Sequence, residues 1–557
     1  MESTSDTDDE RSVSRKKAKG TTGKAVSNSD IDIDSFVTHL LNSFNLSEVD
    51  TLRQTDSDKE LVDRVIMVYT LLWRKFAQLD DTIGVISGSK KRPDLRAGAI
   101  CRKKGACANT KRRVGAVPGV EIGDIFFFRF EMCLVGLHTP TIAGIDFMNV
   151  QISGNEEPVA VSIVSAGLYE DQGDDGEVLI YSGQGGAQRK DKPQTDQELV
   201  RGNLALEKNL HKGIKVRVIH GLKDCQHTTT KVYVYDGLYT IQESWIEKGK
   251  SDCNVFKYKL VRVPGQPDGF RLWKSIQKWK DNRGAITRDG VILPDLSSGT
   301  EKLPVCLVND VDNEKGPANF TYRCDLKYKT PFPLTNSSTT CTCSNGCQAG
   351  TNCPCIQKNG GYAPYTHLGV LLSHNTLIHE CGNSCRCPDT CRNRISQSGL
   401  KIRLEVFKTR DRGWGLRSWD PIRSGAFICE YAGVVVEGKR FDSDDNYVFD
   451  ATRVYEPIES VASGQPPKFP FPFVISAKNE GNVGRFMNHS CSPNVYWLPV
   501  VCEFQHDAYF HVGFYAIKHI PPMQELTFNY GRPRDDKGGA RRKKCLCGSP
   551  RCKGSFY

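Results

Sequence analysis

The stretch that decides the fold is CTCSNGCQAGTNCPC at residues 341–355, followed by CGNSCRCPDTC at residues 381–391. Its nine cysteines lie too close together for all of them to pair as disulfides, and nine is an odd number. Zinc explains the pattern better, because thiolates bind it tetrahedrally and the bound ion contributes folding free energy directly. Nine thiolates satisfy three zinc ions if six cysteines bind one ion each and three cysteines bridge two ions.

Four further cysteines predict a second metal site near the end of the sequence. Cys491 stands alone, and the pattern Cys545-x-Cys547-x4-Cys552 follows it. Together they supply the four ligands of one zinc ion. We therefore predict four zinc ions, three in a cluster and one in the last site, bound by Cys341, Cys343, Cys347, Cys353, Cys355, Cys381, Cys385, Cys387, Cys391, Cys491, Cys545, Cys547 and Cys552.

The alternative to metal binding is a secreted domain held together by disulfides. The N-terminal string MESTSDTDDERSVSRKKAKG has no apolar stretch after a basic start, so no secretory signal is expected. No window approaches the roughly 20 apolar residues of a membrane span. We therefore expect an intracellular protein with no membrane partner, in which thiols stay reduced and clustered cysteines bind metal.

Length and charge set broader limits. At 557 residues the chain is too long for a single core, and three or four domains are expected. The formal net charge of +10 falls to about +5 once thiolates and zinc are included, so bulk charge says little about nucleic acid. Basic runs at residues 15–17, 90–92, 102–104 and 111–113 suit nuclear import or contact with a phosphate backbone, and solvated disorder explains each run equally well.

The N-terminal region divides by composition. Residues 1–30 are rich in Ser, Asp and Lys, which predicts disorder. Residues 31–84 carry apolar side chains at helical spacing, which predicts two amphipathic helices packed on each other or on a later domain. A homodimer or a protein partner bound through these helices is the alternative role. A basic linker is expected over residues 85–114.

Residues 115–270 contain short strand-like segments separated by Gly and Asp-Gly turns, which predicts a curved β-sheet domain. The strings PGVEIGD at 118–124, YSGQGG at 181–186 and YDGLY at 235–239 closely resemble the SRA (or YDG) domain, a family that flips 5-methylcytosine out of DNA into a pocket. The resemblance implies that Tyr169 and Tyr181 stack on the base and that Asp171 bonds the cytosine edge. It also implies that the loop at 138–146, with apolar Ile142, fills the gap left by the base. Ordinary β-core tyrosines are the structural alternative.

Four strings carry the remaining chemistry: RGWGL at 412–416, DNYVF at 445–449, RFMNHSC at 485–491 and ELTFNY at 525–530. In this order, between the nine cysteines and the last three, they resemble the SET-domain lysine methyltransferases of the Su(var)3-9 group. The SRA-like domain upstream narrows the resemblance to the plant SUVH family. The implied fold is multidomain and mainly β: a short helical segment, a barrel-like SRA domain, a linker (271–338), a pre-SET zinc domain (339–399), a SET domain with knot-like C-terminal threading (400–531) and a post-SET zinc site (541–557).

The same resemblance assigns roles to individual residues. Tyr530 is the implied catalytic hydroxyl and Tyr447 the second hydroxyl, while Phe528 occupies the position that sets product size. Because Phe528 has no hydroxyl to hold a water, di- or trimethylation is predicted to be sterically allowed. Phe556 or Tyr557 is expected to complete the substrate channel. The implied cofactor is S-adenosylmethionine, bound by Arg412, Gly413, Trp414, Asp445, Tyr447, Arg485, Asn488 and His489.

These features predict a nuclear, chromatin-bound enzyme that methylates histone H3 at lysine 9 in nucleosomes and is recruited by methylated DNA. The histone tail is expected to add a strand in an open groove, next to the acidic segment 441–445. The alternative from another class is a methyl-DNA reader that acts as a recruitment platform with weak or no methyltransferase activity. A plain zinc-finger protein is disfavoured, because the Cys–His spacing that docks a helix in the major groove is absent.

Overall fold

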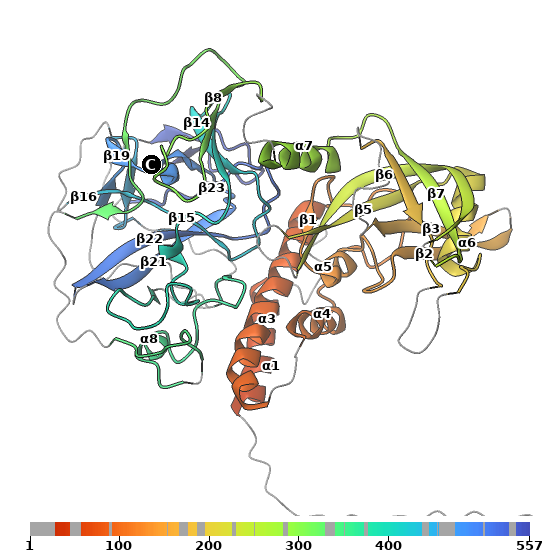
Figure 1. Ribbon diagram of the computed structural model, residues 1–557, viewed down its shortest axis with the longest axis horizontal. Coiled ribbons are helices and arrows are strands. Elements are labelled where there is room, and N and C mark those ends of the chain that lie inside the picture. Colours follow the sequence, from red (N-terminus) through yellow and green to blue (C-terminus); the bar gives the residue numbers. More distant parts are fainter. Residues whose placement is uncertain are drawn as a thin grey trace, which may run out of the picture.

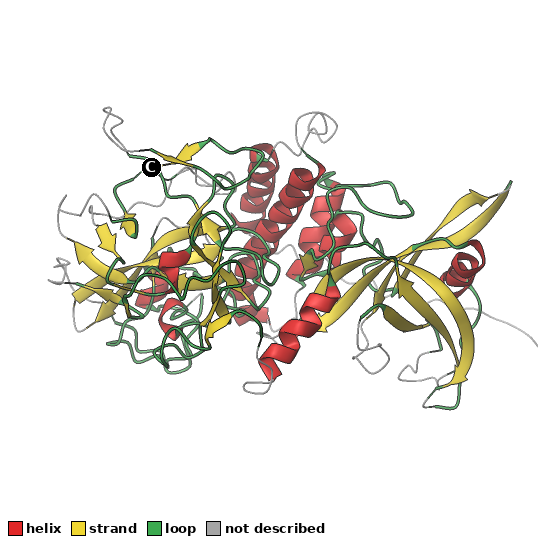
Figure 2. Ribbon diagram, turned by 90° about the horizontal axis from the view of Figure 1, so that it is seen from above, coloured by secondary structure: helices red, strands yellow, loops and turns green. Residues whose placement is uncertain are grey.

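A computed structural model shows how the chain is arranged (Figure 1). Two β-rich halves lie on either side of a long helix, and Figure 2 shows most of the helices gathered between the two groups of strands. None of the described helices is both long enough and apolar enough to cross a membrane. The structure describes residues 28–44, 57–87, 92–152, 154–165, 176–186, 195–224, 230–249, 251–281, 288–328, 340–349, 351–372, 377–436, 445–453, 455, 474–504, 507–533 and 542–556.

The helical layer consists of α1 (Asn28–Ser43), α3 (Asp58–Ser87) and α4 (Pro93–Lys103). The first two lie where apolar spacing predicts helices, whereas α4 lies inside the expected basic linker and begins with a proline, which is pre-organised for a first helical turn. The apolar side chains of these helices are buried in one cluster that also contains Phe126 and Val370, one from each half. The helices therefore pack on both halves of the molecule.

The N-terminal half is a seven-stranded sheet with the order β2-β3-β5-β6-β7-β4, in which β1 also pairs with β6. Only β3 and β5 pair in parallel, and register shifts in β5 and β6 bend the sheet. The elements of this domain are β1 (Ile125–Phe126), α5 (Arg129–Leu134), β2 (Ile145–Ile152), β3 (Asn155–Ser165), β4 (Val178–Ser182), α6 (Arg201–Lys212), β5 (Val216–Lys223), β6 (Lys231–Lys248) and β7 (Asn254–Arg262).

The segment 271–338, expected to be a linker, contains regular structure in its described parts. It includes most of α7 (Phe270–Asp281), and the strands β8 (Val291–Leu293), β9 (Cys306–Val308), β10 (Thr321–Tyr322) and β11 (Leu326–Lys327). Strands β9, β10 and β11 each pair in parallel with a strand of the C-terminal half. Strands of two or three residues show no alternation of apolar and polar side chains, so sequence periodicity does not reveal them.

The C-terminal half is built from small sheets around one core. Three sheets have four strands, in the orders β14-β13-β9-β8, β11-β16-β18-β17 and β12-β21-β22-β15. The mainly β, multidomain fold is confirmed. Its elements are α8 (Pro354–Gln357), β12 (Ile378–His379), η3 (Ser396–Ser398), β13 (Leu404–Lys408), β14 (Trp414–Ser418), β15 (Phe427–Glu430), β16 (Gly433–Val436), β17 (Val448–Asp450), β18 (Val474–Ser476), β19 (Glu480–Gly481), η4 (Val483–Phe486), β20 (Asn488–His489), β21 (Val495–Phe504), β22 (Asp507–Ala516), β23 (Thr527–Phe528), β24 (Lys543–Lys544) and β25 (Ser555–Phe556).

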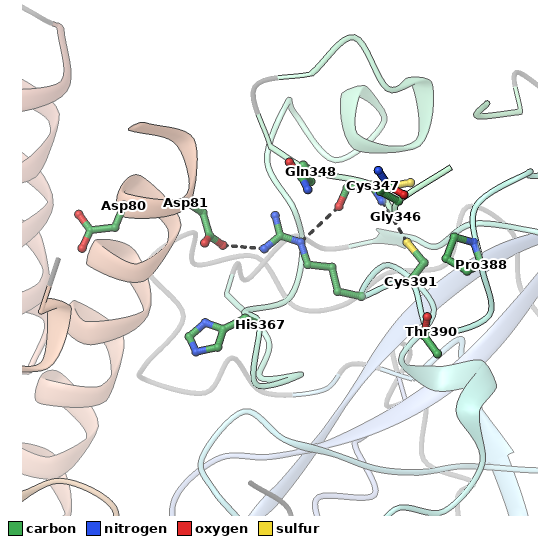
Figure 3. Close-up of a pocket in the computed structure, with 11 residues that line it drawn as sticks. Asp80, Asp81, Gly346, Cys347, Gln348, His367, Pro388, Thr390 and Cys391 are labelled. Carbon is green, nitrogen blue, oxygen red and sulfur yellow. Dashed lines mark hydrogen bonds and ion pairs between the residues drawn. The ribbon is translucent and has the colours of Figure 1, made fainter. Parts of the chain in front are cut away.

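Helix α3 contacts the cysteine-rich segment through an ion pair. Asp81 Oδ2 lies 2.8 Å from Arg392 Nη1, and Arg392 Nε donates to the backbone oxygen of Cys347 at 3.3 Å. Figure 3 shows this contact at the edge of a cavity of about 580 Å³, which lies between the helix and the cysteine-rich loops and is also lined by His367. Arg392 therefore links α3 directly to the cysteine-rich segment.

Candidate active site and metal centres

The cysteines of the first cluster gather as three overlapping groups of four. The groups are Cys341, Cys343, Cys347 and Cys353; Cys341, Cys355, Cys381 and Cys385; and Cys341, Cys347, Cys381 and Cys387, with all sulfur atoms in each group within 4.8 Å of one another. Three cysteines recur in more than one group: Cys341, Cys347 and Cys381. These three occupy the central positions that bridging thiolates need, in agreement with the count of three bridges.

The sulfur separations suit tetrahedral zinc. A zinc–sulfur bond of about 2.3 Å places two ligand sulfurs about 3.8 Å apart. The Cys347 sulfur lies 3.5 Å from that of Cys341 and 3.4 Å from that of Cys381. Cys391, the ninth cysteine, belongs beside them, because its sulfur accepts from the backbone nitrogen of Cys347 at 3.3 Å. The donor set therefore fits a three-zinc cluster.

Hydrogen bonds from outside the cluster hold the thiolates in place. The side-chain amide of Asn393 donates to the Cys381 sulfur at 3.2 Å, and Arg394 Nε donates to the Cys387 sulfur at 3.4 Å. Arg394 Nη2 also donates to the backbone oxygen of Gly382 at 2.7 Å. Such contacts orient metal ligands and offset the negative charge that thiolates leave on a zinc cluster.

The four remaining cysteines form a separate group near the end of the chain. The sulfurs of Cys491, Cys545, Cys547 and Cys552 lie within 4.8 Å of one another, and those of Cys491 and Cys545 are 3.7 Å apart. This donor set fits one more zinc ion with no open position for water. The site joins the end of the chain to the segment that carries His489, two residues before Cys491.

Two strings that are distant in sequence run side by side in the C-terminal half. Strand β20 pairs in parallel with β23, so that Asn488 lies opposite Thr527 and His489 lies opposite Phe528. The backbone nitrogen of Ser490 continues the pairing by donating to the oxygen of Phe528 at 3.1 Å. This threading brings RFMNHSC and ELTFNY to one place, as the resemblance implies.

A narrow aromatic pocket lies where these strings meet. Its volume is about 20 Å³, and it is lined by Tyr431, Asn446, Val448, Phe449, Tyr455, Arg485, Met487, Phe528 and Tyr530. The ring of Phe528 lies 4.7 Å from that of Tyr530 and 4.9 Å from that of Phe514. Because Phe528 is buried and has no hydroxyl, its side of the pocket is apolar.

Tyr530 is fixed in the pocket by three neighbours. Its hydroxyl donates to the backbone oxygen of Met487 at 2.8 Å, and its backbone nitrogen donates to His489 Nδ1 at 3.2 Å. The ring of Phe556 stacks on His489 at 4.6 Å and meets the edge of Tyr530 at 5.6 Å. Burial raises the pKa of Tyr530, so the phenol keeps its proton at neutral pH. The C-terminal segment that follows Cys552 therefore packs, through Phe556, against a residue that lines the pocket.

Arg485 offers buried hydrogen-bond donors beside the pocket. Its guanidinium lies over the ring of Tyr447 at 3.9 Å and over that of Phe320 at 4.1 Å. Nε and Nη1 of Arg485 have no hydrogen-bond partner among the described residues. Buried donors without partners are costly, so they indicate a place for an anionic or carbonyl group of a ligand. Asp445 supports the same wall by accepting from the backbone nitrogen of Tyr447 at 2.8 Å.

The other predicted cofactor residues meet at Glu525. Its Oε2 lies 2.8 Å from Arg412 Nη2, and its Oε1 accepts from Asn488 Nδ2 at 2.9 Å. The same amide of Asn488 also donates to the backbone oxygen of Trp414 at 3.2 Å. Gly413 has a positive φ of 69°, a conformation that suits glycine and turns the chain into β14. Arg412 and Asn488 thus meet at one carboxylate, and Asn488 links that carboxylate to the backbone of Trp414.

In the N-terminal half, Tyr181 is buried on β4, opposite Tyr258 of β7. The following loop, residues 183–186, is fixed by Asn203, which donates to the backbone oxygen of Gln184 and accepts from its nitrogen, both at 2.9 Å. Ile142 is 89% exposed at the tip of the loop predicted to enter the DNA. Tyr169 and Asp171 lie outside the described residues, as do residues 441–444 and Tyr557.

Comparisons with known proteins agree with this arrangement. Three family models match the chain: the SAD/SRA domain at residues 113–266, the Pre-SET motif at 297–394 and the SET domain at 413–531. The tobacco (Nicotiana tabacum) protein named histone-lysine N-methyltransferase, H3 lysine-9 specific SUVH1, is 60% identical over 531 residues, which cover 95% of this chain and 74% of the relative. The chain belongs to the SUVH family. The family resemblance read from the sequence is thereby confirmed.

Solved SUVH structures share the fold. Arabidopsis thaliana SUVH6 in complex with S-adenosylmethionine (SAM) has a TM-score of 0.75 and 37% identity, and covers 90% of this chain and 100% of that one. KRYPTONITE in complex with mCHH DNA, an H3(1–15) peptide and SAH has a TM-score of 0.69 and 32% identity, with the same coverage of both chains. The order of SRA, pre-SET and SET domains in this SUVH chain is therefore one that solved proteins adopt.

Sequence reasoning missed two residues of this SUVH site. Glu525 opens the string ELTFNY but received no role, although an ionisable residue at the start of a motif was a usable signal. Arg453 Nη1 donates to the backbone oxygen of Tyr530 at 3.1 Å, and no motif contains it. Both residues act on the site from outside the pocket, by holding residues that line it or lie beside it.

Proposed function

We propose that this SUVH chain transfers a methyl group from S-adenosylmethionine to lysine 9 of histone H3. The observation that carries the proposal is the buried Tyr530 hydroxyl in a narrow aromatic pocket, next to the donors of Arg485 that lack partners. The relatives support it, because they include a protein named an H3 lysine-9 specific methyltransferase and solved complexes with SAM and with an H3 peptide.

The pocket favours the reactive form of the substrate lysine. S-Adenosylmethionine supplies, when bound, a methyl group carried on a sulfonium. The aromatic walls exclude water from the lysine, and burial lowers the pKa of an amine, so the neutral nucleophile becomes more populated. The Tyr530 hydroxyl donates a hydrogen bond to the Met487 oxygen, which leaves a lone pair of the phenol oxygen free to accept a hydrogen bond from the amine. Tyr530 therefore orients the nitrogen for in-line attack.

The remaining residues of the site bind and orient the cofactor. Arg485, whose Nε and Nη1 lack partners among the described residues, suits the carboxylate of the methionine part, because hydrogen bonds between a guanidinium and a carboxylate are strengthened by their charges. The rest of the cofactor is proposed to be bound by Arg412, Gly413, Trp414, Asn488 and His489. Asp445 and Tyr447 are proposed to lie at the side of the pocket. Phe528 is proposed to leave room for di- or trimethylated lysine.

Methyl transfer can be tested directly. We expect the zinc-replete protein to transfer labelled methyl groups to an H3 peptide, and to lose transfer when lysine 9 is replaced or when Tyr530 is changed to Phe. The matched control is Tyr258→Phe, which removes a buried hydroxyl that donates to Asn203 in the other half at 3.0 Å. Absence of transfer by the unaltered protein would favour the recruitment-platform reading instead.

We further propose that the SRA domain binds 5-methylcytosine in DNA, with Tyr181 as one stacking face and Tyr169 and Asp171 completing the pocket. Tyr181→Ala should abolish the preference for a methylated over an unmethylated duplex. The control is Ile180→Ala, because neighbouring residues of a strand point to opposite faces of the sheet. Equal binding of both duplexes by the unaltered protein would contradict a working base pocket.

Chromatin association follows from these two activities together. A nuclear location is proposed from the basic runs in the sequence, and imaging of a tagged protein with and without the run at 15–17 tests it. A homodimer or a partner bound through α1 and α3 stays a prediction. Because their apolar side chains are buried within this chain, a partner would have to use their polar faces. Light scattering of the purified protein measures the oligomeric state.

A further inference from the structure

Two arginines hold a loop of the SRA domain that has an exposed apolar tip. Ile142 is 89% exposed at the tip of this loop, residues 138–146. Arg129 donates to the backbone oxygen of Ile142 at 3.5 Å. Arg112 donates to the backbone oxygen of Phe147, just beyond the other end of the loop, at 3.2 Å. Two positive charges therefore lie beside this loop.

Helix α4 brings further positive charge to the same place. It packs so closely on α5 that a Cβ atom added at Gly98 would lie 2.2 Å from the ring of Phe130. Arg102, in the last turn of α4, lies over the same ring at 5.1 Å. Burial raises the pKa of the Cys133 thiol to about 11, and the positive charges of Arg102 and Arg129 limit this rise. Both guanidinium groups are therefore near Cys133. The end of α4 and the Ile142 loop thus belong to one surface.

The surface contains five exposed cations, which mostly lack acidic partners: Arg102, Lys103, Lys104, Lys111 and Arg112. Across the described ranges, Arg112 alone among them forms an ion pair, with Asp146 at 3.7 Å. A group of cations without matching carboxylates creates a positive potential that attracts a polyanion. We call this group the α4 basic surface, and it consists of Arg102, Lys103, Lys104, Lys111 and Arg112.

The α4 basic surface is continuous with the base pocket. A Cβ atom added at Gly144, in the Ile142 loop, would lie 2.7 Å from the hydroxyl oxygen of Tyr181. The guanidinium of Arg129 is also close enough to Tyr181 to oppose the rise in the phenol pKa that burial causes. Yet the SRA family model begins at residue 113, so the α4 basic surface lies outside it.

We infer that the α4 basic surface binds the phosphate backbone of the duplex beside the flipped base, so that the DNA footprint extends beyond the SRA domain onto α4. This contact presupposes the methyl-DNA binding proposed above. Phosphate contacts position a duplex without reading its sequence, and an apolar side chain between cations suits insertion into the base stack. The competing role is structural, because cations at the end of a helix also complement its dipole.

A charge-matched pair of triple variants separates the two roles. The test variant is Lys103→Ser, Lys104→Ser and Lys111→Ser in the full chain. The control variant is Lys315→Ser, Lys358→Ser and Lys401→Ser, which removes the same charge from the C-terminal half. Binding of a methylated and an unmethylated duplex is measured by fluorescence anisotropy between 50 and 200 mM salt, and H3 peptide methylation without DNA confirms that both variants are folded.

We expect the test variant to weaken both duplexes by the same factor, on the order of 100-fold at 0.1 M salt. The slope of log affinity against log salt should become shallower by about 3, one for each lost phosphate contact. The ratio of methylated to unmethylated affinity should not change. If the test variant keeps the slope and affinity of the control, the phosphate contact is refuted while the base pocket stands. If methyl preference is absent but the slope changes, the base pocket fails and the phosphate contact stands.

Discussion

Replacing Glu525 with alanine should weaken cofactor binding without altering the chemical step. The carboxylate of Glu525 holds Arg412 at 2.8 Å and Asn488 at 2.9 Å, and both belong to the proposed cofactor site. Glu525 does not line the pocket that contains Tyr530. Its loss should therefore raise the KM for S-adenosylmethionine and leave kcat nearly unchanged.

The expected loss of cofactor affinity follows from the two hydrogen bonds that Glu525 accepts. Hydrogen bonds to a charged group contribute about 1.5–3 kcal/mol each when buried. The Glu525 and Arg412 side chains are 17% and 25% exposed, so solvent screening reduces the total to about 2–4 kcal/mol. That range corresponds to a loss of affinity of about 30- to 1000-fold. Glu525→Gln keeps one acceptor for Asn488 and should lose only about 5- to 30-fold.

Calorimetric titration with S-adenosylmethionine and steady-state methyl transfer to an H3 peptide measure both effects. The control is Glu157→Ala, which removes a carboxylate that is 18% exposed and paired with Lys208 and Lys212, far from the site in the SRA domain. Thermal unfolding of both variants shows whether the fold is kept. A Glu525→Ala protein that binds the cofactor as the unaltered protein does, or that loses kcat alone, would refute a positioning role.

Three further predictions address product size, metal and pH. Phe528→Tyr adds a hydroxyl to a pocket of about 20 Å³, and mass spectrometry of the H3 peptide should show mainly monomethylation. Cys491→Ser removes one ligand of the last zinc site, so elemental analysis should fall from four to three zinc ions per chain and methyl transfer should be lost while DNA binding persists. Burial lowers the pKa of His138 from 6.5 to about 4, so the unfolded chain takes up the proton first. The SRA domain should therefore keep its stability above pH 6.5 and lose up to about 3 kcal/mol by pH 4, a loss that denaturant unfolding should find reduced in His138→Gln.

The metal sites could be predicted because their ligands are one residue type and mostly stand in short runs of sequence. The exception is Cys491, which lies 54 residues before Cys545. Even the number of bridging thiolates followed from the coordination of zinc, and the structure places Cys341, Cys347 and Cys381 where bridges are needed. The threading of Asn488 beside Thr527 followed only from family resemblance, because no local pattern encodes a pairing across such a distance.

Sequence patterns did not predict the strands and helices that are stabilised by contacts with residues far along the chain. Strands β9, β10 and β11 are too short for alternation, and they exist because they pair with strands far along the chain. Helix α4 was hidden by its charge, since the basic residues at its end masked the buried side that carries Ala97 and Cys101. Glu525 was missed because its role depends on contacts with Arg412 and Asn488, which are distant from it in the sequence.

The aspartate of the YDG string shows how the DNA-binding half is tied to the catalytic half. Asp236 is buried, and it accepts hydrogen bonds from the Tyr239 hydroxyl at 2.6 Å and from the first backbone nitrogen of α7, that of Phe270, at 2.8 Å. At its other end α7 contacts the SET domain, where Trp279 packs on Trp419 at 5.7 Å. A string that marks the SRA family therefore anchors the helix that leads to the SET domain.

Buried charges across the interface then oppose separation of the two halves. Arg423 of the SET domain forms an ion pair with Asp224 of the SRA domain at 3.2 Å, and His519 Nε2 lies within hydrogen-bond distance of Glu131 Oε1, at 2.9 Å, with all four side chains less than 10% exposed. Removing one partner of a buried ion pair costs about 3–5 kcal/mol, because the other charge is left without compensation. A hinge motion that broke the Arg423–Asp224 contact in the folded chain would carry a similar cost. The buried contacts therefore oppose relative motion of the SRA and SET domains.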